Sequence, residues 1–115
     1  MIYFRILLSL MFLTIAAYTA VTISHHGLGL LTVFFGDMRA MTWPGQFNLD
    51  FFTFLLMSGL WLAWRHNFSP AGLAFGIVGV FGGMLFLSAY LLVASFRAKG
   101  DIRVMLLGDI RAKAG

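Results

Sequence analysis

The chain has 115 residues, of which 61% are hydrophobic and only 10% are charged, whereas soluble domains contain about 25% charged residues. A soluble domain of this length has too little interior to bury so many apolar side chains, so we expect a single integral membrane domain over residues 1–115. The absence of cysteine excludes disulfides and thiolate metal sites. The net charge of +4 comes mostly from one tail beside an apolar segment, which favours the lipid bilayer as partner and argues against nucleic acid.

Residues 2–23 form the first long apolar segment and contain a single charge, Arg5, near their start. Because about 20 consecutive apolar residues span the hydrocarbon core of a bilayer, we predict a transmembrane helix here. A cleaved secretory signal is the alternative, in which Arg5 alone would form the basic region. The apolar run is long for a signal, and Tyr18 interrupts the best cleavage site.

Residues 24–46 are expected to form a partly embedded loop rather than a span. Their apolar part, residues 27–36, is too short to cross the bilayer. It therefore lies in the interface, re-enters the membrane or packs on the bundle. Trp43 suits the level of the lipid headgroups, and Pro44-Gly45 signals a turn.

Residues 47–64 are predicted to form the second transmembrane helix, about 27 Å long at 1.5 Å per residue. Trp61 and Trp64 then lie near the far interface. The third predicted span covers residues 70–96 and begins at Ser69, a favourable N-cap. This segment is longer than a bilayer requires, so we expect it to tilt or to emerge from the membrane.

Residues 97–115 form a basic tail, which we interpret as a short amphipathic helix at the membrane interface. The tetrapeptide GDIR occurs twice in it, at 100–103 and 108–111. On a single helix this spacing of eight rotates the second copy by about 80° from the first. The two copies would not form one stripe, and we interpret the repetition as a coincidence.

The distribution of Lys and Arg predicts an orientation in the membrane. With three spans, Arg5 and Arg65 lie on the side of the N-terminus. The other six share the side of the long loop and the tail: Arg39, Arg97, Lys99, Arg103, Arg111 and Lys113. Because the more basic side is normally cytoplasmic, we expect the N-terminus outside and the C-terminus in the cytoplasm.

Asp50 is the principal polar candidate, because an ionisable residue within a membrane span is a functional candidate. If Asn48 caps the second helix, Asp50 lies in its first turn, where a carboxylate stabilises the helix dipole. Alternatively, Asp50 is a polar anchor for an ion pair or a ligand. His25 and His26 lie near the same membrane face, where either of them would make a proton-responsive contact with Asp50 or would meet only headgroups and water.

We expect no metal and no cofactor. His66 follows the second span whereas His25 and His26 follow the first, which places them on opposite membrane faces about 30 Å apart. Adjacent histidines also point in different directions, and two of them without Cys or Glu are a weak metal signal. No paired acid and base is identifiable in the sequence, so we expect no enzymatic activity.

The most regular pattern is a run of glycines in the third span at spacings of 4, 3 and 4, which keeps them within about 60° on one helix face. These residues are Gly72, Gly76, Gly79 and Gly83. Small residues let helices approach closely in lipid. The glycine face either holds the chain's own helices together, with Ser9, Ala16 and Ala20 of the first span as a partly matching surface, or contacts a second copy or a partner subunit.

Several short motifs lie between His26 and Ala112: HG after the first span, then NLDFFTFLL, WLAWRHNFSP, GGMLFLSAYLL and RAKGDIRVMLLG. Through them the chain resembles a group of small bacterial membrane proteins that form a domain of unknown function. The resemblance implies a multi-pass protein of the cell inner membrane with no assigned activity. His66 departs from the acidic residue that this group carries after the Arg.

The sequence thus predicts an all-α membrane protein with three transmembrane helices and no enzymatic activity. The leading hypothesis is a small subunit or modulator that packs through the glycine face of the third span, either on a membrane-protein partner or as a homo-oligomer. The alternative is binding or transport of a lipophilic ligand or a proton, with Asp50 as the polar anchor.

Overall fold

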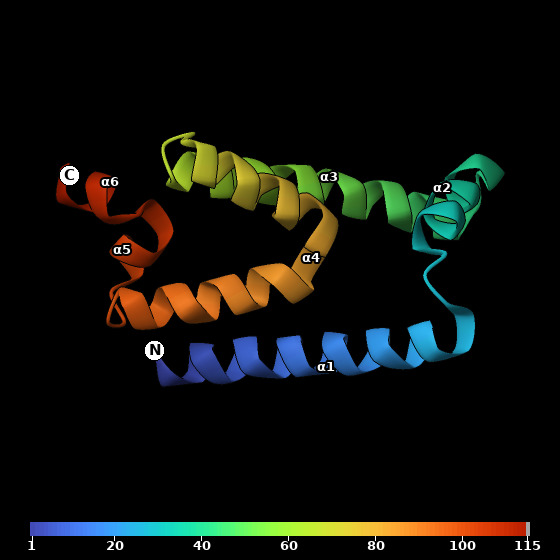
Figure 1. The fold of residues 1–115 in the computed structure, drawn as a ribbon, viewed down its shortest axis with the longest axis horizontal. Helices are drawn as coiled ribbons and strands as arrows, with labels where there is room; N and C mark the ends of the chain where they lie inside the picture. Colours follow the sequence, from blue (N-terminus) through green and yellow to red (C-terminus); the bar gives the residue numbers. More distant parts are fainter. Residues whose placement is uncertain (115) are drawn as a thin grey trace.

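The computed structural model describes residues 1–114, which form a bundle of α-helices (Figure 1). The helices are α1 (Ile2–His26), α2 (Leu30–Ala40), α3 (Trp43–Arg65), α4 (Pro70–Arg97), α5 (Ile102–Leu107) and α6 (Asp109–Ala114). Helices α1, α3 and α4 are long and apolar enough to cross a membrane. The prediction of an all-α fold with three such helices is therefore confirmed. The bundle is 48 Å long, close to the thickness of about 40–45 Å of a bilayer with its headgroups.

Helix α3 begins earlier than the sequence suggested. Its first residue is Trp43, preceded by Thr42 at the N-cap, and Pro44 lies within the first turn. Proline is tolerated there because the first backbone N–H groups of a helix have no partner within the helix. Asp50 consequently lies about 10 Å along α3 at 1.5 Å per residue. The prediction that Asp50 lies in the first turn was wrong.

Asn48 does not cap a helix but joins α3 to α2. Its amide nitrogen donates to the Phe34 carbonyl oxygen at 3.1 Å and to Asp37 Oδ2 at 3.4 Å. Gly45 is buried at the same contact, and a Cβ added to it would collide with the Asp37 carbonyl oxygen. Gly45 is thus not a turn residue but permits the close approach of the two helices.

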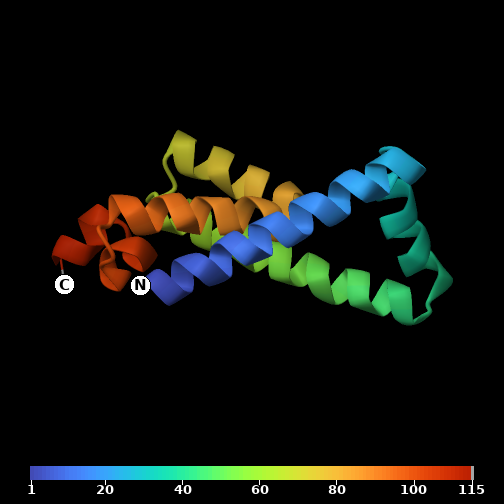
Figure 2. The same cartoon turned by 90° about the horizontal axis from the view of Figure 1, so that it is seen from below.

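The sequence left the placement of residues 27–36 open, and in the structure residues 30–36 belong to helix α2. Figure 2 shows it running across one end of the bundle, from the C-terminus of α1 to the N-terminus of α3. Its residues are largely exposed apart from the side that faces α3. This course is that of a connecting helix lying across the end of the bundle.

Helix α4 is broken at Gly83, whose backbone angles (φ 57°, ψ −144°) are not helical. Only glycine adopts this region at little cost. Figure 1 shows that the chain doubles back there, so that a first arm (residues 70–82) runs beside α3 and a second arm (residues 84–97) returns. The rings of Phe75 and Phe86, one from each arm, stack with centroids 6.4 Å apart. At 1.5 Å per residue each arm is only about 20 Å long.

Helix α1 packs along the second arm of α4. Arg5 Nε donates to Ser95 Oγ at 3.1 Å and Arg5 Nη2 donates to the Ser95 carbonyl oxygen at 3.0 Å. Leu8, three residues further along α1, is buried. Both chain termini therefore lie at the same end of the bundle (Figures 1 and 2). We expected the termini on opposite membrane faces because a continuous third span would cross the bilayer. The break at Gly83 reverses the chain, so the structure does not support that expectation.

The tail consists of two short helices rather than one, and the GDIR repeat explains why. Each copy starts with a glycine of positive φ, Gly100 at 80° and Gly108 at 82°. Each glycine is followed by an aspartate at the start of a helix, and Asp101 accepts hydrogen bonds from the Arg103 and Val104 backbone nitrogens. Both copies of the repeat therefore lie at a helix start, which the interpretation of the repetition as a coincidence did not anticipate.

Candidate functional site at the basic end

Charge is distributed very unequally between the two ends of the bundle. One end, which we call the basic end, holds the start of α1, the end of α3, both outer ends of α4 and the helices α5 and α6. Seven of the eight Lys and Arg residues lie there, namely Arg5, Arg65, Arg97, Lys99, Arg103, Arg111 and Lys113. The opposite end, formed by the end of α1, by α2 and by the start of α3, carries Arg39 alone.

Arg65 is the most constrained of these basic side chains. Its Nε donates to the Met105 carbonyl oxygen at 2.6 Å, its Nη1 to the Tyr90 hydroxyl at 2.8 Å and its Nη2 to the Val104 carbonyl oxygen at 3.3 Å. All three acceptors are neutral oxygens. A guanidinium has five N–H donors, so two donors remain available. The three hydrogen bonds fix the position of the Arg65 guanidinium without cancelling its positive charge.

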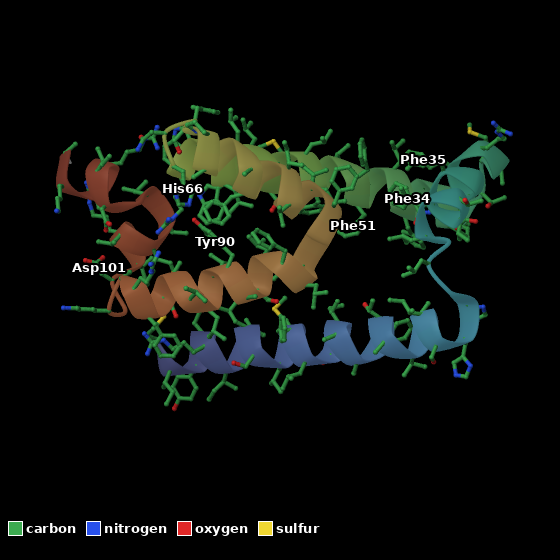
Figure 3. The ribbon with its side chains drawn as sticks, viewed as in Figure 1. Phe34, Phe35, Phe51, His66, Tyr90 and Asp101 are labelled. Carbon is green, nitrogen blue, oxygen red and sulfur yellow. The ribbon has the colours of Figure 1, made fainter. Side chains whose placement is uncertain are left out.

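Tyr90 joins Arg65 to His66. The Tyr90 hydroxyl and His66 Nε2 lie 2.5 Å apart, and the two rings meet edge to face (Figure 3). Phe75 packs against both rings, with centroids 4.9 Å from His66 and 5.7 Å from Tyr90. Partial burial, and secondarily the positive charge of Arg65, lower the pKa of His66 from its usual value of 6.5. The neutral imidazole is therefore favoured in this cluster.

The tail is held against the end of α3 by further polar contacts. Trp61 Nε1 donates to the Leu106 carbonyl oxygen at 3.2 Å. The Arg111 guanidinium lies 4.0 Å over the Trp64 ring and also donates to the Trp64 carbonyl oxygen. Cation–π contacts of this kind are worth about 0.5–2 kcal/mol. Helices α5 and α6 are thus docked on the bundle, and Met105 of α5 is buried in a cluster with Ala94 and Ala98.

A cavity of about 530 Å³ opens between the docked tail and the ends of α3 and α4. The residues that line it are Arg65, His66, Asn67, Ser69, Arg97, Ala98, Val104, Gly108, Asp109 and Ile110. The lining therefore includes two arginines and one aspartate, together with the neutral polar residues Asn67 and Ser69. Such a lining recognises an anion better than a cation.

The predicted polar anchor is not assembled in the structure. Asp50, His25 and His26 are all exposed. Figure 2 shows the end of α1, which carries both histidines, well separated from α3 with α2 running between them. Among residues 1–114 the Asp50 carboxylate takes part in no hydrogen bond, although its backbone oxygen accepts one from Thr53 Oγ1 at 2.6 Å. The proposed contact between a histidine and Asp50 is thus not formed.

The glycine face of α4 packs against α3 inside the chain. Gly72, Gly76 and Gly79 are buried, and a Cβ on Gly76 would lie 2.8 Å from the Gly59 carbonyl oxygen. Gly83 belongs to the break instead of the straight packing face. The partner helix is therefore α3, whereas the sequence suggested a surface on the first span with Ser9, Ala16 and Ala20.

Sequence reasoning missed three residues of this region. Gly59 was not singled out, although Gly59 and Ala63 form a small-residue pair four positions apart, the same signal that was recognised in the third span. Arg65 entered only the count of basic residues and a motif, and Tyr90 entered only as part of the motif GGMLFLSAYLL. The sequence has no local signal that links Arg65 to Tyr90, because their contact depends on the reversal of α4.

Metal binding finds no support in the arrangement of side chains. Among residues 1–114, no three His, Cys, Asp or Glu side chains lie close enough together to hold a metal ion. His66 lies at the basic end, whereas His25 and His26 lie at the C-terminus of α1, at the other end of the bundle.

Comparison of the chain with protein-family models, with curated proteins and with solved structures gives no significant match. The resemblance to small bacterial membrane proteins of unknown function stays a prediction from the motifs.

Proposed function

We propose that this chain is a non-enzymatic, multi-pass protein of the inner membrane that acts as a small subunit or modulator, holding a partner helix against the face of α3 that carries Asp50. The observation that carries this proposal is the exposed Asp50 carboxylate within an apolar helix. Its helical neighbours Phe47 and Phe54 are 65% and 71% exposed, so the carboxylate lies on a surface suited to lipid.

The depth of Asp50 makes this position costly in a monomer. Trp43 and Trp64 are separated by about 32 Å along α3 at 1.5 Å per residue, which matches the hydrocarbon thickness of about 30 Å between two aromatic belts. Asp50 is then about 10 Å inside the belt at Trp43. A carboxylate at the centre of a bilayer costs about 2.5–3.5 kcal/mol. A partner helix with a basic or hydrogen-bond-donating side chain at this depth would offset much of that cost.

The proposed partner surface differs from the glycine face that the sequence suggested. Because Gly72, Gly76 and Gly79 are buried against α3, they are not available to another chain. The Asp50 face lies outside this contact. The partner is a second copy of the chain or another membrane protein, and the size of a cross-linked product distinguishes the two.

Cross-linking through single cysteines tests the proposal, because the chain has none of its own. Phe54→Cys places a thiol on the Asp50 face, and Leu13→Cys, which replaces a side chain that is 61% exposed on α1, is the matched control. We expect one discrete adduct at Phe54→Cys in native membranes and its loss when Asp50→Leu is added. An equal yield of adduct at Leu13→Cys, or an unchanged yield of the Phe54→Cys adduct when Asp50→Leu is added, would contradict the proposal.

The second candidate function, binding or transport of a lipophilic ligand or a proton, uses the same carboxylate in a different way. An amide retains hydrogen bonding but does not titrate. Asp50→Asn should therefore preserve much of the adduct if Asp50 holds a partner. If Phe54→Cys gives no adduct and Asp50→Asn abolishes a proton-dependent uptake, the second candidate replaces the first.

We also propose that both termini of the chain face the cytoplasm. The supporting observations are the reversal of α4 at Gly83 and the presence of seven of eight Lys and Arg residues at the end that carries both termini. Basic residues are retained on the cytoplasmic side. In intact cells a membrane-impermeant maleimide should label His26→Cys but should label Ile2→Cys and Lys113→Cys only after permeabilisation. Labelling of Lys113→Cys in intact cells would overturn this orientation.

A further inference from the structure

We infer that the cavity at the basic end is a binding site for a phosphate-bearing anion, and that the phosphodiester of an acidic phospholipid headgroup is its ligand. This site is separate from the Asp50 face, so the inference does not depend on the proposed partner. Its first support is the lining of the cavity, to which Arg65 contributes from the end of α3 and Arg97 from the end of α4.

Arg65 is arranged in advance for an anion. Three of its five donors are used by Tyr90 and by two carbonyl oxygens of the tail. These contacts hold the guanidinium in place, so little side-chain freedom remains to be lost when a ligand binds. The two remaining donors, on the terminal nitrogens, suit phosphate oxygens, which guanidinium groups bind in a bidentate manner.

The remaining lining residues favour one negative charge over two. Arg65 and Arg97 bring two positive charges and Asp109 brings one negative charge, so the lining carries a net charge of about +1 with His66 neutral. A phosphodiester carries a single negative charge. A phosphate monoester is largely dianionic near neutral pH, and its second charge would be repelled by the Asp109 carboxylate.

The location and size of the cavity also favour a lipid. It adjoins the end of α3, where Trp61 and Trp64 lie at the depth expected for lipid headgroups. A volume of about 530 Å³ falls within the range of about 300–1,000 Å³ that small ligands occupy. Asn67 and Ser69 provide neutral partners for the hydroxyl groups of a headgroup such as glycerol.

The test compares Arg97→Gln with Lys99→Gln in the full-length protein. Both variants remove one positive charge from the basic end, but only Arg97 lines the cavity. The protein is placed in phosphatidylcholine nanodiscs, phosphatidylglycerol is added in increasing mole fraction, and tryptophan fluorescence is recorded. A separate arm adds inorganic phosphate to nanodiscs without phosphatidylglycerol.

We expect a saturable response to phosphatidylglycerol that Arg97→Gln weakens about tenfold, the effect of losing one charge-assisted hydrogen bond, and that Lys99→Gln weakens less than twofold. Asp109→Asn should strengthen the response, which keeps the test decisive if Arg97→Gln unfolds. A saturable response to inorganic phosphate alone would replace the lipid by a free anion as ligand. Equal weakening by both charge variants, or no saturable response in either arm, would overturn the inference.

Discussion

Replacing Gly76 by alanine tests how α3 and the first arm of α4 are held together. Gly76 faces Gly59, and a Cβ on Gly76 would lie 2.8 Å from the Gly59 carbonyl oxygen, whereas ordinary contacts of a Cβ begin at 3.4 Å. The obstacle is backbone, which cannot rotate aside, so the helices must separate locally by about half an ångström. Overpacking of this kind costs about 1–3 kcal/mol.

Alanine also has an advantage of up to about 1 kcal/mol over glycine within a helix, which would mask part of this cost. Gly36→Ala in α2 is therefore the matched control, because a Cβ at Gly36 meets no atom within 4 Å. The difference between the two variants removes the helix propensity and leaves the overlap. We expect Gly76→Ala to be about 1–3 kcal/mol less stable than Gly36→Ala.

Unfolding by sodium dodecyl sulfate in mixed micelles, followed by circular dichroism, gives this free energy. Gly59→Ala should behave like Gly76→Ala, since its Cβ would lie 2.8 Å from the Gly76 carbonyl oxygen. The double variant should cost less than the sum of the two, because helices that have already separated accept the second methyl group more easily. Equal stability of Gly76→Ala and Gly36→Ala would refute the close contact between α3 and α4.

Three further outcomes are expected from the same unfolding assay. Tyr90→Phe removes the hydroxyl that Arg65 and His66 share and should lower the free energy of unfolding by about 1.5–3 kcal/mol. The control Tyr18→Phe, at an exposed position, should have little effect. Equal losses in the two variants would contradict the role of the Tyr90 hydroxyl. Because the pKa of His66 is lower in the folded chain than its ordinary 6.5, unfolding binds a proton below that pH, so stability should be complete above about pH 6.5 and should fall as the pH drops further. His66→Gln should abolish this slope, and an unchanged slope would assign it to other groups. Gly83→Ala should cost about 1–3 kcal/mol, because alanine is strained at the Gly83 backbone angles; a neutral effect would mean that the break does not need glycine.

The apolar segments and their helical state could be predicted because lipid imposes a minimum length on any apolar helix that crosses it. The start of α3 could not, since Pro44-Gly45 has the composition of a turn. Pro44 is equally suited to the first turn of a helix, and Gly45 is required there by the approach of α2. Only the contact with another segment decides between the two.

The reversal of α4 could not be predicted from the sequence for a similar reason. Gly79 and Gly83 have the same local pattern, yet Gly79 is helical and buried against α3 whereas Gly83 breaks the helix. Since the cluster of Arg65, His66 and Tyr90 depends on this break, the candidate site could not be assembled from sequence spacing. The GDIR repeat, in contrast, carried a readable signal, because a glycine followed by aspartate commonly ends one helix and starts the next.

The break at Gly83 has a consequence for how the chain is made. The insertion machinery meets residues 70–97 as one apolar stretch that is long enough to be threaded through the bilayer, and a continuous helix would deliver α5 and α6 to the far side. In the finished fold the stretch turns back at Gly83. Five basic residues at its end or after it oppose translocation: Arg97, Lys99, Arg103, Arg111 and Lys113. Under the proposed orientation, the backbone conformation of Gly83 therefore decides on which side of the membrane α5 and α6 are placed.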